Sequence, residues 1–104
     1  LNRGVHAFIP STMEIIYNKI YNLFIENKVD LSRELFCKIL PILSFTHQHI
    51  DIAIKFSKML RVKEGIFETS MCRSPIKTFD SFQQEEANLL LKQVSILQDS
   101  FNIN

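Results

Sequence analysis

Two histidines separated by one residue, His47 and His49, suggest metal chemistry more than any other residues of the chain. A zinc site needs several nitrogen or sulfur ligands, and structural sites usually show a recognisable spacing such as Cys-x₂-Cys. Cys37 and Cys72 stand far from the histidines and from each other. On a helix, side chains two positions apart point to different sides. We therefore expect no metal and no other cofactor, and histidines that cap or hydrogen-bond backbone at an inter-helix corner.

A cysteine thiolate beside a general base is the second arrangement that can perform chemistry. Cys37 is expected inside a helix, as a core or near-surface residue, with no glycine-rich approach loop beside it. Cys72 is expected in an exposed loop. Gly4 and Gly65 stand alone, which excludes phosphate-binding glycine loops. We predict no catalytic residue and a protein that is not an enzyme.

A run of basic residues favours contact with phosphates, as in nucleic-acid binding: Lys55, Lys58, Arg61 and Lys63. The net charge of the chain is only +1, with 12 basic and 11 acidic side chains, whereas nucleic-acid-binding domains are typically strongly basic. The aromatic residues nearby, Phe56 and Phe67, are expected to pack in the protein and not to stack on bases. RNA binding through the basic 55–77 region is therefore the alternative function, less favoured than a protein partner.

The C-terminal helix, expected over 80–101, carries apolar residues on two sides. One stripe is sufficient to dock the helix on a core: Ala87, Leu90, Leu91, Val94, Leu97 and Phe101. Phe82, Leu89 and Ile96 follow one another at intervals of seven and form a second stripe on nearly the opposite side. A monomeric surface helix needs only one such stripe. The second stripe is either covered by the 63–79 connection or a binding surface for a missing helix, another protein or a second copy.

Composition places these residues in an all-α protein. The chain has 104 residues, 46% of them hydrophobic, which is long enough for one core and for a single helical domain. Only two Gly and three Pro leave few turns and favour long helices. No apolar run approaches the roughly 18 residues of a membrane span, and two cysteines indicate an intracellular protein. Because the chain opens on Leu1, we expect it to be part of a larger protein.

Hydrophobic periodicity and capping residues predict about four helices, arranged as stacked antiparallel hairpins or an irregular bundle. Ser11 or Thr12 is the expected cap of the first, Asp30 of the second, and Asp80 with Gln83 forms a capping box for the fourth. The ranges are 11–27, 31–46 with a kink at Pro41, 48–62 and 80–101. Pro41 falls on the polar side of its helix, so we expect the helix to bend there and continue.

The stretch HIDIAIKFSKMLRVKEGIF, with the helix before it, resembles the helical hairpin of pentatricopeptide and tetratricopeptide repeats. Asp51, Ala53, Phe56, Met59 and the later Gly65 carry the resemblance, which covers about a third of the chain. The spacing from Ala53 to Met59 differs by one residue from the repeat pattern, and no second copy follows at a period of about 34 residues. The resemblance implies a stacked-hairpin architecture. It carries over no RNA-reading position.

Together these observations predict a protein-protein interaction module or helical scaffold segment. Its expected binding residues are Phe82, Leu89 and Ile96, and its expected partner is another protein or a second copy forming a homodimer.

Overall fold

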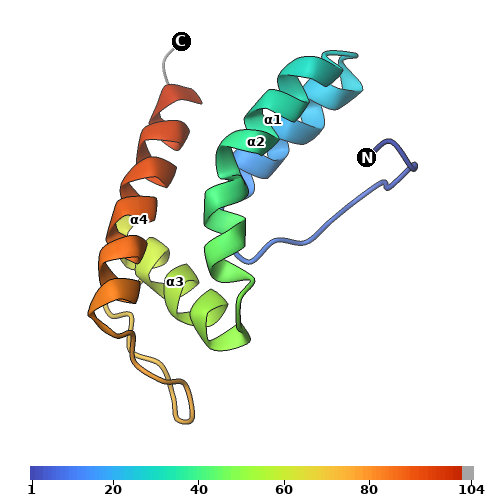
Figure 1. The fold of residues 1–104 in the computed structure, drawn as a ribbon. Coiled ribbons are helices and arrows are strands. Elements are labelled where there is room, and N and C mark those ends of the chain that lie inside the picture. The colour runs from blue at the N-terminus through green and yellow to red at the C-terminus, as the bar shows by residue number, and fades with distance from the viewer. Residues whose placement is uncertain (102–104) are drawn as a thin grey trace. The chain divides into compact units, whose positions relative to one another are not determined.

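Four helices make up the regular structure of residues 1–101, the part of the chain that the computed structural model describes. They are α1 (Glu14–Ile25), α2 (Val29–Thr46), α3 (Ile50–Lys63) and α4 (Ser81–Phe101), and the described residues contain no strand (Figure 1). The predicted all-α fold class is confirmed. No helix among the described residues has the length and apolar character needed to cross a lipid bilayer.

The chain divides into two compact units, one from Leu1 to Leu40 and one that begins at Pro41. The first contains the lead-in segment (residues 1–13), α1 and most of α2. The second contains the last turns of α2, followed by α3, the connection and α4. The boundary lies within α2, so each unit is described by itself.

In the first unit, α1 and α2 are joined by a Schellman turn and by a buried hydrogen bond. The backbone N–H of Lys28 donates to the carbonyl of Leu23 at 2.9 Å, and Asn27 adopts the left-handed conformation that ends the helix. Across the hairpin, Ser32 Oγ donates to the carbonyl of Ile20 at 2.8 Å. This bond satisfies a buried hydroxyl and fixes the register of the two helices.

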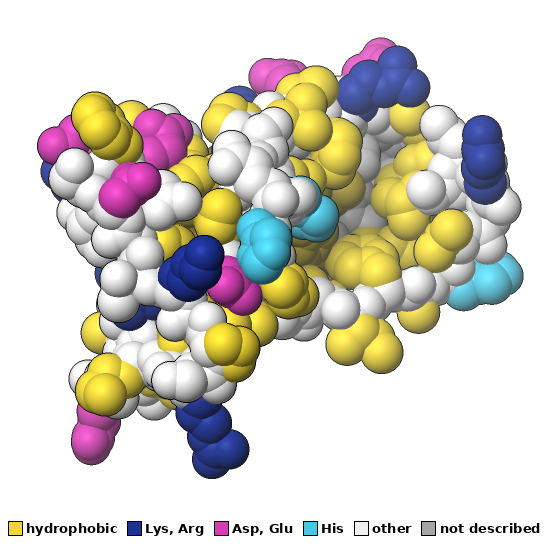
Figure 2. Space-filling model, turned by 60° about the horizontal axis from the view of Figure 1, so that its bottom comes forward, with side chains coloured by type: hydrophobic (Ala, Val, Ile, Leu, Met, Phe, Trp, Pro, Cys, Tyr) yellow, Lys and Arg dark blue, Asp and Glu magenta, His cyan; other side chains and the backbone are white. Residues whose placement is uncertain are grey.

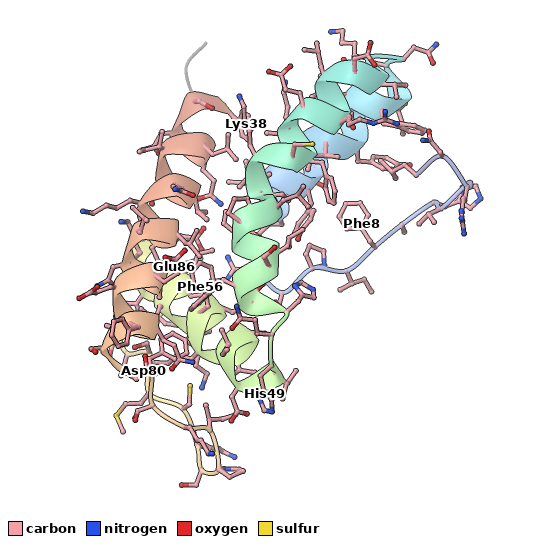
Figure 3. All side chains as sticks on the ribbon, viewed as in Figure 1. Phe8, Lys38, His49, Phe56, Asp80 and Glu86 are labelled. Atoms are coloured by element: carbon pink, nitrogen blue, oxygen red, sulfur yellow. The ribbon has the colours of Figure 1, made fainter. Side chains whose placement is uncertain are left out.

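The lead-in segment packs against α1 through an aromatic cluster. The ring of Phe8 meets the ring of Tyr17 edge to face, with centroids 5.5 Å apart, and that of Tyr21 at 6.4 Å. Phe8 points from the lead-in toward the helices (Figure 3). Edge-to-face pairs at these separations are favourable arrangements of aromatic rings.

Helix α2 continues through Pro41, as the sequence predicts. Pro41 is exposed, together with Glu34, Lys38 and Ser44, so the carbonyl that lacks its hydrogen bond lies on the solvent side. The helix does not end before Thr46. The bend at Pro41 stays a prediction.

In the second unit, α3 and α4 pack together around Phe56 (Figure 3). Its ring meets that of Phe45 edge to face, at a centroid separation of 5.9 Å, and Phe45 meets Phe79 at the same separation. The buried apolar residues of this unit are Ile42, Phe45, Ile52, Phe56, Leu60, Ala87, Leu90, Leu91 and Val94. The α4 stripe predicted to dock on the core is thus confirmed at its central positions.

Two local predictions were wrong. The N-cap of α1 is Met13, in a left-handed conformation and without a side-chain bond, instead of Ser11 or Thr12. Asp30 does not precede α2 but lies within its first turn. There its negative charge interacts favourably with the positive end of the helix dipole. Three large apolar side chains of α2 are exposed: Leu31, Phe36 and Leu40.

Candidate functional site

Helix α4 carries an exposed apolar row on the side away from its buried stripe. Phe82 is 81% exposed, Leu89 52% and Ile96 71%. By contrast, Ala87, Leu90 and Val94 are almost completely buried. The row therefore belongs to the surface of the second unit, and we call Phe82, Leu89 and Ile96 the α4 row.

A capping box fixes the start of α4 one residue before the row begins. The backbone N–H of Gln83 donates to Asp80 Oδ1 at 2.8 Å, and the N–H of Asp80 donates to Gln83 Oε1 at 3.0 Å. Asp80 lies at the first turn of the helix (Figure 3). The predicted capping box is confirmed, and it holds Phe82 within an ordered first turn.

The connection between α3 and α4 does not cover the α4 row, since all three side chains of the row are exposed. It is held on α3 instead: Lys55 Nζ donates to the carbonyl of Ser70 at 3.0 Å and to its hydroxyl at 3.2 Å. Lys58 Nζ donates to the carbonyl of Met71 at 3.1 Å. Of the alternatives raised by the sequence, coverage by the connection is the one that this geometry contradicts.

The basic residues predicted to contact nucleic acid are largely engaged within the protein. Lys55 and Lys58 hold the connection, and Arg61 Nη1 donates to Glu64 Oε1 at 3.0 Å in a largely buried ion pair. Lys63 is the one of the four whose side chain is exposed. Three of the four cations therefore have acceptors inside the fold that a phosphate would have to replace.

Both histidines form hydrogen bonds with backbone groups, as the sequence predicts. His49 is the N-cap of α3, where its Nδ1 accepts a hydrogen bond from the N–H of Asp51 at 3.1 Å. His47 Nδ1 lies 2.9 Å from the carbonyl of Leu43. His49 stands at the corner where α3 begins (Figure 3). Within residues 1–101, no group of three or more His, Cys, Asp or Glu side chains is placed to hold a metal ion.

Both cysteines are free thiols in separate environments. Cys37 is exposed on α2, and Cys72 is half-buried in the connection, where its Sγ lies 3.6 Å from the carbonyl of Ser70. Cys37 thus lies at the surface, within the core or near-surface range expected for it, and Cys72 is less exposed than expected.

A groove that no sequence pattern predicted lies in the first unit, between the lead-in segment and the two helices. Its volume is about 640 Å³, and apolar side chains gather around it (Figure 2). Phe8, Ile20, Phe24 and Phe36 contribute to its walls, and Arg33 is the one charged side chain that lines it. The apolar residues of the lead-in were the available signal, but segments without periodicity predict no packing partner.

A smaller and more polar hollow, of about 440 Å³, lies in the second unit beside the starts of α3 and α4. It is lined by His49, Asp51, Ile52, Lys77, Thr78, Phe79, Asp80 and Gln83. Several of these polar groups already cap the two helices, through His49 with Asp51 and Asp80 with Gln83. The hollow is therefore explained by the capping of the helices.

Comparisons of the chain with protein-family models, with curated proteins and with solved structures found no match. The resemblance to helical repeats stays a prediction, and the function has to be inferred from the surface itself.

Proposed function

We propose that this chain is a non-enzymatic helical module that binds a protein partner through the α4 row. The observation that carries the proposal is the exposure of three large apolar side chains in one line, at 81%, 52% and 71%. Large apolar side chains aligned on one face of a helix are the anchors that a helix-binding groove or a partner helix recognises, whereas single exposed apolar residues need no such explanation.

The size of the row supports recognition of a helix or a shallow groove. Full burial of an apolar side chain of this size contributes about 1.5–3 kcal/mol. Three such side chains supply only part of the free energy that association requires, because binding also costs translational and rotational freedom. The partner must therefore add contacts around the row, and Phe82, as the aromatic and most exposed member, is the expected anchor.

The two free thiols support an intracellular location for this module, because disulfides form and persist in oxidising compartments. In this proposal the two helical units serve as a scaffold that presents α4. The stacked-hairpin likeness to helical repeats agrees with such a role.

The test is to place a photo-crosslinking amino acid at position 89 in the native cells and to look for covalent adducts of defined mass. The same group at position 63, on α3, is the matched control. We expect adducts from position 89 that are lost when Phe82→Glu and Ile96→Glu are added. If position 89 gives no more adduct than position 63, the proposed function is wrong.

RNA binding through the 55–77 region remains the alternative proposal. It predicts retention on single-stranded RNA at low salt and a steep decline of affinity as salt increases. The internal hydrogen bonds of Lys55 and Lys58 favour the α4 row over this alternative.

A further inference from the structure

The spacing of the α4 row is symmetric about its central residue. Leu89 lies seven residues after Phe82 and seven before Ile96, and on a helix these three side chains share one side. If a second copy of the helix is reversed about Leu89, its Ile96 meets Phe82 and its Leu89 meets Leu89. An interface related by a two-fold axis requires this self-complementary pattern.

Charged and polar side chains flank the row at similar distances on either side of Leu89. Glu85 and Lys92 lie on one flank of the row, on either side of Leu89, and Glu86 and Gln93 lie on the other. All four belong to α4, and Glu85, Glu86, Lys92 and Gln93 are exposed.

The flanking charges distinguish the two orientations in which a pair can form. In an antiparallel pair, the flank that carries Glu85 and Lys92 lies beside the same flank of the second copy. Because the second helix runs in the opposite direction, Glu85 of each copy faces Lys92 of the other. In a parallel pair, the flank that carries Glu85 lies beside the flank of the second copy that carries Glu86. The two helices run in the same direction, so Glu85 of each copy faces Glu86 of the other. Opposite charges across an interface favour an orientation, and like charges exclude it.

We infer that the partner of the α4 row is a second copy of this chain, paired antiparallel with Leu89 on the two-fold axis. This inference rests on the proposed function, because it names the occupant of the same surface. The connection leaves the row open, since Lys55 and Lys58 hold it on α3.

The test uses single cysteines in a chain whose Cys37 and Cys72 are replaced by serine. Under mild oxidation, we expect Leu89→Cys to form a disulfide-linked dimer by itself. Phe82→Cys and Ile96→Cys should each form no disulfide-linked dimer alone and should crosslink with each other when mixed. If Phe82→Cys and Ile96→Cys each crosslink with themselves, the antiparallel arrangement is wrong.

Charge reversal provides a second readout on the chain with its native apolar row. Glu85→Lys places two cations opposite each other and should weaken dimerisation at least several-fold, as measured by mass against concentration. Adding Lys92→Glu to the same chain restores opposite charges and should restore the dimer. An unchanged dimer in Glu85→Lys contradicts the pairing.

The outcome separates this inference from the proposed function. Self-pairing alone is contradicted if the chain stays monomeric at all concentrations and forms no disulfide dimer, while position 89 still gives adducts whose mass differs from that of a dimer. The proposed function then stands with a different protein as the partner. If neither experiment gives an adduct, both are wrong.

Discussion

Asp80 and Gln83 cap each other's backbone at the start of α4, with N–H to side-chain oxygen distances of 2.8 and 3.0 Å. This reciprocal pair satisfies two N–H groups that a helix otherwise leaves without an intrahelical acceptor. It thereby determines where the helix begins and where the α4 row is presented.

Removal of this cap should loosen the first turn of α4. We expect Asp80→Ala to lower the free energy of unfolding by about 1 kcal/mol and to accelerate amide hydrogen exchange at the start of the helix. Asp99→Ala, an exposed acid far from the cap, is the matched control and should have little effect. Equal exchange in the two variants would show that the box does not stabilise this end.

Loss of the lysine contacts should release the connection from α3. We expect Lys55→Met with Lys58→Met to increase limited proteolysis between residues 66 and 76 several-fold, because three hydrogen bonds from ammonium groups are removed. Lys63→Met removes an exposed lysine of the same helix and is the control. Cleavage at the same rate in all variants would mean that other contacts hold the connection.

Tyr17 should make the first unit sensitive to alkaline pH. Burial raises the pKa of its phenol above the ordinary value of 10.0, because the charged form is poorly solvated. The folded state thus holds this proton more tightly than the unfolded chain. Its contribution to stability is complete below about pH 10 and is lost as pH rises through the folded pKa.

Two variants measure this effect. The chain contains two tyrosines, so an absorbance titration of Tyr21→Phe reports the pKa of Tyr17 alone, and we expect a value above 10.0. Tyr17→Phe should show less alkaline loss of stability than the native chain. A titration at or below the ordinary value would contradict the burial of this phenol.

Replacement of Pro41 should stabilise α2. Proline within a helix removes one hydrogen bond and crowds the preceding turn, at a cost of about 3 kcal/mol. Because proline also restricts the unfolded chain, we expect Pro41→Ala to raise the free energy of unfolding by roughly 1–2 kcal/mol. Denaturant titration measures this, with the exposed neighbour Lys38→Ala as control. A destabilised variant would mean that the local backbone requires proline.

The sequence predicted the helices well because each has a strong apolar period. Ile52, Phe56 and Leu60 of α3 lie where the period puts them, in the core. The capping box of α4 was predictable because both of its partners are local in sequence. The residues of the α4 row were identified from their spacing, and their exposure is now established.

Other features depend on contacts that no local pattern encodes. The buried bond from Ser32 to the carbonyl of Ile20 requires the two helices to meet at one register. Phe45 is buried because it packs against Phe56 of α3 and Phe79 of the connection, contacts that its own helix does not specify. Met13, in a left-handed conformation and only 5% exposed, takes the cap position predicted for Ser11 or Thr12.

In the proposed function, α4 turns one apolar side toward its own core and another toward a partner. Adjacent leucines of α4 test it most directly, because Leu90 is 1% exposed and Leu89 is 52% exposed. The measurement is the free energy of unfolding of Leu89→Glu and Leu90→Glu, taken at high dilution.

We predict that Leu89→Glu stays within about 0.5 kcal/mol of the native chain, as surface substitutions do. Leu90→Glu should lose several kcal/mol, because it places a carboxylate in an apolar core. If Leu89→Glu is destabilised as strongly as Leu90→Glu, then the α4 row is part of the core and the proposed binding surface does not exist.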